Sequence, residues 1–348
     1  MICPLSPAHF FAFGAFLLFA VLLFLDANLA PLPLIVFVLT CFLAPLFPRL
    51  SFFLPIVSRG KKGEKGVALT FDDGPDPEVT PKLLEMLAQH GITATFFVPG
   101  ERAERYPDLI RAILAGGHAI GNHSYSHSPF LMLKGSKVLR REVASAQTVF
   151  RRFGIVPLAF RPPVGVTNAQ LGRVLLENGM FCLNFSLRAG DMGNRRVARL
   201  AQRLLAKVAP GDIVLLHDVT PRQVDVPYLL NEFSVLIEGI RQRGLEIVPL
   251  ARLIGKEVMQ LRQAGPSAVE LSGRSQVACC SKWLPAGPGQ PCPAHQPKDS
   301  NVDITRQMAP PPSPASVTAA EVKTLVVIPV YNHAKTLHWV AERALQEG

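Results

Sequence analysis

The sequence predicts an α/β fold built on a parallel sheet and preceded by an apolar membrane segment. Two observations predict it. Short apolar runs alternate with amphipathic helical stretches between residues 67 and 250, and two uncharged apolar runs occupy residues 10–25 and 29–47. Alternation of strands and helices is typical of a parallel sheet, either open or closed into a barrel. With 348 residues, the chain has room for one or two domains of ordinary size.

Each N-terminal apolar run is near the lower length limit for a helix that spans a bilayer. A cleaved signal peptide is disfavoured, because no Lys or Arg precedes Arg49 and no small-residue cleavage site follows the first run. We therefore expect residues 1–60 to be a retained anchor, a two-helix hairpin that turns near Asp26. Pro31 and Pro33 leave open a re-entrant or interfacial second segment.

The chain is basic, with a formal net charge of +10, which favours anionic partners such as a lipid surface. No nucleic-acid motif is present, and no aromatic residues interleave with the basic ones, so we expect no nucleic-acid partner. Basic loops tend to stay in the cytoplasm. We therefore expect a domain on the cytoplasmic side of a bacterial-type inner membrane, with an extracytoplasmic location kept open. The basic residues that follow the anchor are Arg49, Arg59, Lys61, Lys62 and Lys65.

The expected strands and helices alternate from residue 67 onward. The strands are expected at 67–73, 93–99, 118–124, 158–163, 182–187, 212–218 and 246–250. The helices are expected at 80–90, 104–116, 137–153, 168–179, 195–208 and 227–243. In such folds, the chemistry gathers at the carboxyl ends of the strands. A stretch rich in Pro, Gly, Ser and Gln then predicts a linker over residues 259–321.

Two clusters of metal-binding residue types lie at strand ends. Asp72 and Asp73 close the first strand, and paired acids raise each other's pKa unless a cation or donor intervenes. One of them is suited to ligate a metal and the other to act as a base, although a helix cap or turn is the alternative. His123 and His127 have the i, i+4 spacing that places two imidazoles on one helical face.

Two further strand ends carry an arginine and a histidine. Arg161 begins the sequence RPPVG (161–165), where it is suited to orient a catalytic carboxylate. His217 ends an apolar strand and is followed by Asp218. Taken singly, a surface loop, a core histidine and a turn residue explain these positions as well.

Together, the four clusters resemble the motifs of polysaccharide deacetylases of the NodB-homology type, the family 4 carbohydrate esterases. The matching sequences are TFDDGP (70–75), HSYSH (123–127), RPPVG (161–165) and LLH (215–217). The resemblance covers about residues 65–255. It implies a distorted (β/α) barrel over residues 61–258 and a divalent metal, typically zinc, with cobalt as an alternative.

The resemblance also implies roles for individual residues. It implies Asp73, His123 and His127 as the metal ligands, Asp72 as the general base, Arg161 as the residue that orients the base, and His217 as the general acid. The implied reaction is hydrolysis of N-acetyl groups on a carbohydrate. A catalytically silent sugar-binding relative and a membrane scaffold are the alternatives. Nothing in the sequence indicates the oligomeric state.

The sequence departs from the family pattern at two places. Val164 stands where the family often has an aromatic residue. The family's D-x-x-D-W motif corresponds to residues 188–192, where only Asp191 matches and the tryptophan is absent. The resemblance implies Asp191 as a further catalytic residue, at a position that tunes the histidine acid. These departures leave the substrate open, and a small or lipid-linked amino sugar is an alternative to a long polymer.

Residues 322–348 resemble the beginning of a family 2 glycosyltransferase, whose first strand reads like LVVIPVYNHA (325–334). The acidic nucleotide-sugar motifs of that family are not in this sequence. The resemblance implies a fragment of a deacetylase–glycosyltransferase fusion. Because nucleotide sugars are cytoplasmic, it agrees with the membrane side that the basic flank predicts.

Overall fold

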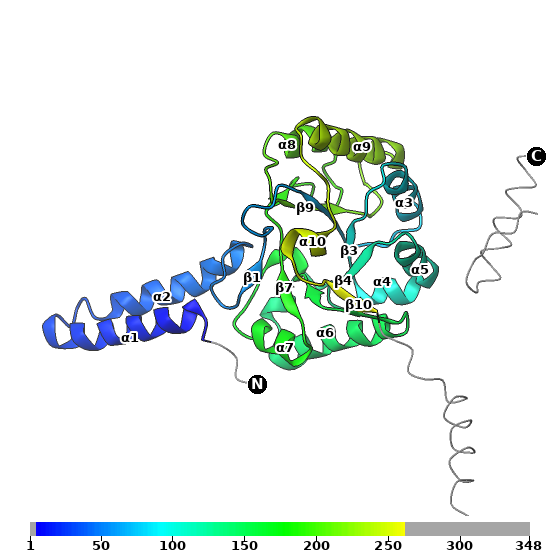
Figure 1. The fold of residues 1–348 in the computed structure, drawn as a ribbon. Helices are drawn as coiled ribbons and strands as arrows, with labels where there is room; N and C mark the ends of the chain where they lie inside the picture. The colour runs from blue at the N-terminus through cyan, green and yellow to red at the C-terminus, as the bar shows by residue number, and fades with distance from the viewer. Residues whose placement is uncertain (1–4, 262–348) are drawn as a thin grey trace, which may run out of the picture. The chain divides into compact units, whose positions relative to one another are not determined.

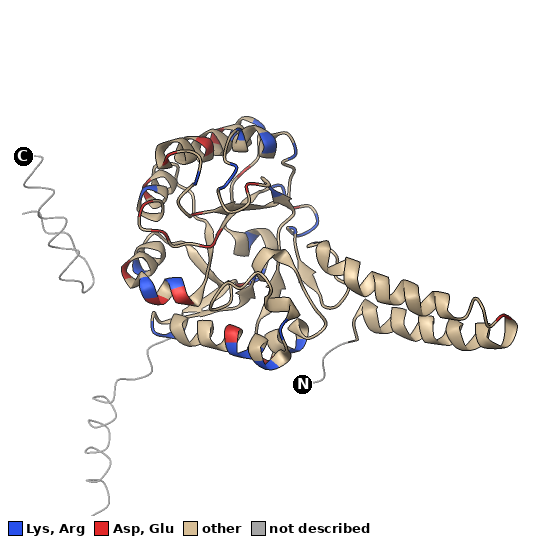
Figure 2. Ribbon diagram, turned by 180° about the vertical axis from the view of Figure 1, so that it is seen from behind, with Lys and Arg blue, Asp and Glu red and all other residues tan. Residues whose placement is uncertain are grey.

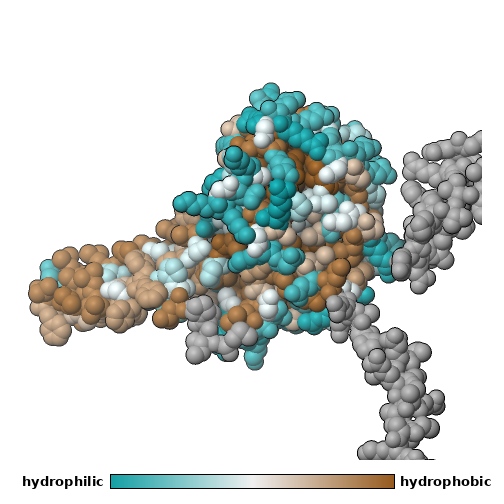
Figure 3. Space-filling model, in the orientation of Figure 1, coloured by the Kyte–Doolittle hydropathy of each residue, from teal (hydrophilic) through white to brown (hydrophobic). Residues whose placement is uncertain are grey.

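The computed structural model describes residues 5–261, and its first part is a pair of apolar helices. Helix α1 (Pro7–Leu25) and helix α2 (Pro31–Leu43) lie side by side, followed by a 3₁₀ turn, η1 (Ala44–Leu46) (Figure 1). We call residues 7–46 the hairpin. Asp26, at its tip, is its one Asp, Glu, Lys or Arg (Figure 2), and its carboxylate accepts a hydrogen bond from the Asn28 backbone N–H at 2.9 Å. Apolar side chains cover most of its surface (Figure 3).

Within the described residues, α1 is the helix long and apolar enough to cross a bilayer, with a mean hydropathy of 2.4. Only 11% of its apolar window is buried, whereas the core helix of a globular domain would be mostly buried. A helix of this kind near the N-terminus is a weak sign of an anchor or a signal sequence. Helix α2 is shorter than a full span.

The rest of the described chain folds around a curled sheet of eight parallel strands, a half-barrel that confirms the predicted α/β class. The strand order is β1-β7-β6-β4-β3-β2-β9-β8. Their bounds are β1 (Ile56–Val57), β2 (Ala68–Asp72), β3 (Thr95–Val98), β4 (Ala119–Asn122), β6 (Ala159–Phe160), β7 (Phe181–Leu183), β8 (Leu187–Arg188) and β9 (Ile213–His217). A second sheet pairs β5 (Ile155–Pro157) with β10 (Met259–Leu261) antiparallel.

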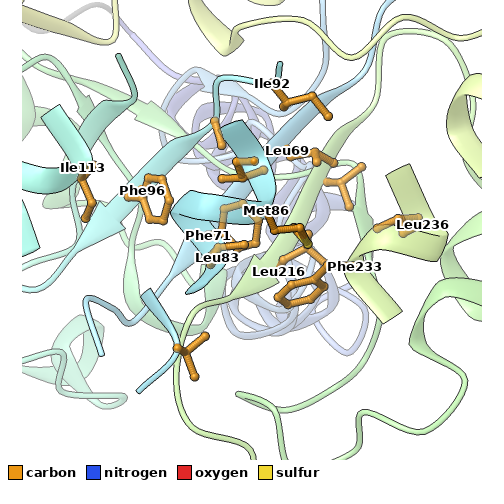
Figure 4. Close-up of a cluster of buried hydrophobic side chains, with 14 of the residues drawn as sticks. Leu69, Phe71, Leu83, Met86, Ile92, Phe96, Ile113, Leu216, Phe233 and Leu236 are labelled. Carbon is orange, nitrogen blue, oxygen red and sulfur yellow. The ribbon is translucent and has the colours of Figure 1, made fainter. Parts of the chain in front are cut away.

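Helices cover the outside of the sheet (Figure 1). They are α3 (Thr80–Gln89), α4 (Gly100–Arg105), α5 (Pro107–Ala115), α6 (Ser136–Arg151), α7 (Leu171–Glu177), α8 (Leu200–Leu205) and α9 (Val226–Gln242). The short helix α10 (Leu250–Ile254) packs on the opposite, inner face of the sheet, and η2 (Leu131–Leu133) and η3 (Pro163–Gly165) are 3₁₀ turns. The largest buried cluster lies between β2, β3 and these helices (Figure 4). There the ring of Phe71 stacks on Phe96 at 5.3 Å and meets the edge of Phe233 at 5.6 Å.

Two element predictions were wrong. The expected strand at 246–250 forms only an isolated bridge between Val67 and Ile247, because Pro249 cannot donate to a ladder and α10 starts at the next residue. The expected helix at 104–116 is divided at Tyr106, because Pro107 lacks the N–H that would continue α4.

The strand register places the chemistry-bearing residues side by side. Strand β2 lies between β3 and β9, and Asp72 is paired in register with His217 on β9. The strands run parallel, so their carboxyl ends meet at one edge of the sheet. The described structure therefore brings the ends of β2, β4, β6 and β9 together, each followed by one of the four sequence clusters.

Candidate active site

The carboxyl ends of these strands line one cavity of about 1040 Å³. Six of the seven residues expected at the site line it, and the seventh, Arg161, lies fully buried behind Asp72. The six are Asp72, Asp73, His123, His127, Asp191 and His217. The structure thus brings all seven residues together.

Asp72 and Asp73 are successive residues with different partners. Asp72 ends β2 in extended conformation, whereas Asp73 has a left-handed backbone with φ of 72°. Its Oδ1 lies 3.0 Å from Nε2 of His127 and 3.4 Å from Nε2 of His123. Burial opposes ionisation of Asp73, but the two neighbouring imidazoles hold the pKa of Asp73 well below its usual range.

Asp73, His123 and His127 form a set of donors that fits a divalent ion, since their three ligand atoms all lie within 4.8 Å of one another. Nδ1 of His123 lies 2.7 Å from the backbone oxygen of Arg161. A carbonyl oxygen only accepts, so Nδ1 carries a proton, and Nε2 is the nitrogen of His123 that can ligate a cation beside Asp73. Oδ1 of Asp73 is buried without a hydrogen-bond partner among the described residues. Two imidazoles and one carboxylate are a common ligand set for zinc.

Arg161 holds Asp72 from behind. Its Nη1 donates to Oδ1 of Asp72 at 2.6 Å and to Oγ1 of Thr70 at 2.9 Å, and its Nη2 donates to the Asn184 carbonyl at 3.3 Å. The guanidinium also lies 3.9 Å from the centre of the Phe97 ring. Burial lowers the pKa of Arg161, and the carboxylate of Asp72 opposes that change. The carboxylate is thereby kept in one orientation beside the three candidate ligands.

His217 stands on the other side of Asp73, with its Nε2 3.9 Å from Oδ2 of Asp73. Its Nδ1 lies 2.7 Å from Oδ2 of Asp191. Burial disfavours the charged imidazole, but the interaction with Asp191 outweighs it and raises the pKa of His217 to about 9. Nδ1 donates to Asp191, so the second proton of the imidazolium is on Nε2, which faces the cavity.

Comparison with known proteins agrees with this geometry. The family model "Polysaccharide deacetylase" matches residues 59–182. The chain is 33% identical over 201 residues to a chitooligosaccharide deacetylase of Bradyrhizobium sp. (strain ANU 289), covering 55% of this chain and 91% of that protein. The chain belongs to the polysaccharide deacetylase family.

Other members show the same relationship. A peptidoglycan-N-acetylglucosamine deacetylase of Bacillus cereus is 36% identical over 193 residues, covering 55% of this chain and 89% of that protein. The crystal structure of the Bc1960 peptidoglycan N-acetylglucosamine deacetylase has a TM-score of 0.54 and 28% identity, covering 58% of this chain and 94% of that one. The half-barrel is therefore the fold of family 4 carbohydrate esterases.

Sequence reasoning missed three supporting residues of this polysaccharide deacetylase domain. Thr70 shares a face of β2 with Asp72, and its Oγ1 accepts from Arg161. A polar residue two positions before Asp72 in an apolar strand was the available signal. Asn184 contributes a backbone carbonyl, and Asn194 donates through Nδ2 to the His217 carbonyl at 2.9 Å. No local pattern marks Asn184 or Asn194.

Asp218, which the sequence suggested as a turn residue, is fully buried beneath the DDGP loop. Its Oδ2 accepts from Oγ1 of Thr80 at 2.8 Å, and its backbone N–H donates to the Asp72 carbonyl at 3.3 Å. Burial raises the pKa of Asp218 to about 8. A Cβ added to Gly74 would lie 2.0 Å from Oδ1 of Asp218, so only glycine fits there. Asp218 and Gly74 together fix the loop that presents Asp73.

Proposed function

We propose that this chain is a metal-dependent hydrolase that removes N-acetyl groups from a carbohydrate. The observation that carries the proposal is the register of β2 and β9, which sets Asp72 and His217 side by side next to Asp73, His123 and His127. Relatives are named as chitooligosaccharide and peptidoglycan N-acetylglucosamine deacetylases, and we extend their activity class to this chain.

In this proposal, Asp73, His123 and His127 hold a divalent ion, zinc or cobalt. When bound, such an ion lowers the pKa of water and polarises an amide carbonyl. Asp72, oriented by Arg161, accepts the proton of the attacking water. His217, which Asp191 keeps protonated, donates its Nε2 proton to the departing sugar nitrogen. Acetate and a free amino sugar result.

The same contacts favour an enzyme over a catalytically silent sugar-binding relative or a scaffold. Stability alone does not explain the buried ion pair between Asp72 and Arg161, because apolar residues of similar volume often stabilise a fold equally well. A buried, oriented base and acid flanking a set of metal ligands are what hydrolysis of an amide requires.

We also propose that residues 1–60 anchor the domain of residues 61–258 to a membrane, with that domain in the cytoplasm. The apolar, exposed surface of the hairpin supports the anchor. A reporter fusion at Gly348 is expected to show cytoplasmic activity, and periplasmic activity would overturn the assigned side.

The assignment of residues 259–321 as a linker and of residues 322–348 as the start of a glycosyltransferase remains a proposal from the sequence. Residues 259–261 form β10, while the rest of the expected linker, up to residue 321, lies outside the described residues. The same holds for the glycosyltransferase-like residues 322–348.

The test of the proposed function is acetate release from an N-acetylglucosamine tetramer by the full chain in detergent. The protein is first treated with a chelator and then given zinc or cobalt. Release that disappears with chelation and returns with either ion is the expected result. Absence of both bound metal and acetate release under all these conditions would overturn the proposed function.

A further inference from the structure

Three arginines of the cavity form no ion pair with its acidic residues. Arg188, Arg195 and Arg222 all line it, and all three are exposed. Within residues 5–261, the ion pairs closer than 4.0 Å include none of these three side chains. We call them the rim arginines. By contrast, Arg105 in the same cavity is paired with Glu101 at 2.9 Å.

The acidic residues of the cavity are already engaged elsewhere. Asp72 is bound by Arg161, and Asp191 by His217. Asp73 faces the two histidines, and Asp76 accepts from Oγ1 of Thr220 at 2.9 Å. The rim arginines therefore have no acidic partner among the described residues, although Arg188 lies over the ring of Phe185 at 5.9 Å. A group of like charges at a cavity attracts ligands of the opposite sign. Guanidinium groups bind phosphate through paired hydrogen bonds.

A second part of the cavity mouth is apolar. Val164 and Met192 line the cavity, yet 55% and 60% of their surfaces are exposed. Val164 has φ of 53°, a left-handed conformation that is strained for a β-branched residue. Phe130 and Leu133, which follow the cavity residue Pro129, are 67% and 84% exposed. Apolar side chains exposed at and near a cavity mouth are suited to contact a membrane or an apolar ligand.

The hairpin is attached at the same edge of the cavity. The Pro48 carbonyl, just after η1, accepts from Nδ2 of Asn184 at 2.8 Å. A Cβ on the cavity residue Gly165 would lie 3.4 Å from the Pro48 ring. The start of α1 reaches the same segment, because the Ala8 N–H donates to the Phe52 carbonyl at 3.0 Å. The segment that follows the hairpin therefore passes beside Gly165, the residue after Val164.

We propose that the substrate is an acetamido sugar joined through a phosphate or diphosphate to a membrane lipid. The rim arginines bind the phosphate, and the apolar mouth next to the hairpin receives the first part of the lipid. The proposal rests on the proposed function and narrows its substrate class. It distinguishes this chain from an enzyme for neutral polymers, which would gain nothing from three arginines without acidic partners.

The experiment compares acetate release by the full chain from three probes in phosphatidylcholine vesicles, which carry no net charge. The probes are N-acetylglucosamine linked by diphosphate to a polyprenol, N-acetylglucosamine 1-phosphate, and a neutral N-acetylglucosamine tetramer. We expect kcat/KM to be highest for the lipid-linked probe, and at least about tenfold higher for it than for the tetramer.

Matched variants test the contacts. In Arg188→Gln/Arg195→Gln/Arg222→Gln, the preference for the lipid-linked probe over the tetramer should fall at least about tenfold. The control Arg141→Gln/Arg151→Gln/Arg243→Gln changes the charge equally at exposed sites outside the cavity and should keep the preference. Val164→Ser/Met192→Ser should lower the preference for the lipid-linked probe over the sugar phosphate.

Each contrary outcome has a separate meaning. Equal kcat/KM for charged and neutral probes, or an acidic N-acetylated polymer that is preferred over all three, would overturn the proposed substrate. Equal kcat/KM for the lipid-linked probe and the sugar phosphate would overturn the proposal that the substrate carries a lipid. Absence of release from every probe would overturn the proposed function. In that case, the substrate class is tested by binding. The dissociation constant of the lipid-linked probe is measured for Asp72→Asn and for Asp72→Asn combined with the three Arg→Gln changes, and equal values would overturn the proposed substrate class.

Discussion

Nη1 of Arg161 lies 2.6 Å from Oδ1 of Asp72, and both side chains are almost completely buried. The pair joins the ends of two strands that are not neighbours, β2 and β6. It orients one carboxylate of the Asp72–Asp73 pair and leaves the other to the histidines. The different roles of Asp72 and Asp73 therefore depend on Arg161, which does not itself line the cavity.

Replacing Arg161 with Met should destabilise the fold strongly. Asp72 would be left as a buried charge without a partner, a change that typically costs about 3–5 kcal/mol. Urea unfolding of the full chain in detergent measures the loss. The control is Arg173→Met, since Arg173 is exposed and pairs with Glu177 on the surface, where loss of a pair costs at most about 1 kcal/mol. Similar losses for both variants would contradict the structural role of the Arg161 pair.

Asp191→Asn should shift the alkaline limb of the pH–rate profile to lower pH. In the parent protein, His217 loses its proton as the pH rises through about 9, so activity that needs the protonated imidazole falls there. Without the carboxylate of Asp191, the pKa of His217 should fall toward its ordinary value. The measurement is kcat against pH, with the exposed Asp108→Asn as the control. If the alkaline limb of the kcat–pH profile is unchanged in Asp191→Asn, the assignment of His217 as the general acid would be wrong.

Gly74→Ala should disrupt the loop that carries Asp73. The new methyl group would lie 2.0 Å from the carboxylate of Asp218, which is fixed by Thr80. Overpacking of this kind typically costs about 1–3 kcal/mol, and displacement of Asp73 should lower zinc affinity. Gly135→Ala is the control, because nothing lies within 4 Å of its Cβ position and its φ is −64°. Equal zinc affinity in the two variants would contradict a fixed DDGP loop.

Asp218→Asn should make the fold less sensitive to pH. The pKa of Asp218 is raised to about 8 in the folded protein, so its stabilising contribution is complete below its unfolded pKa and is lost as the pH rises through about 8. Asn cannot ionise. The variant should therefore gain stability relative to the parent protein between about pH 5 and about pH 8 in urea unfolding. A constant difference across that range would show that Asp218 does not titrate within it.

The sequence allowed prediction of the strand ends and of the residues at them, because parallel strands bring their carboxyl ends to one edge. Asp72, His123, Arg161 and His217 each follow or end a buried apolar run, so their meeting could be expected. The role of Asp218 could not be predicted, because its burial depends on Thr80 and Gly74, which come from other parts of the chain.

Other features lay beyond local patterns as well. Strand β8 is two residues long, and β1 and β10 lie outside the expected range of 61–258. Their pairing depends on partners distant in sequence, which no local periodicity encodes. No sequence pattern groups Arg188, Arg195 and Arg222, and only the folded chain shows that they line one cavity.

The most direct test of the account compares Asp72→Asn with Asp73→Asn in the full chain, measuring bound zinc and acetate release together. Asp72→Asn should bind zinc like the parent protein but release acetate at least about 100-fold more slowly, as expected when a general base is removed. Asp73→Asn should lose bound zinc and activity together. Zinc loss in Asp72→Asn with retention in Asp73→Asn, or undiminished release by Asp72→Asn, would contradict the assignment of the two acids.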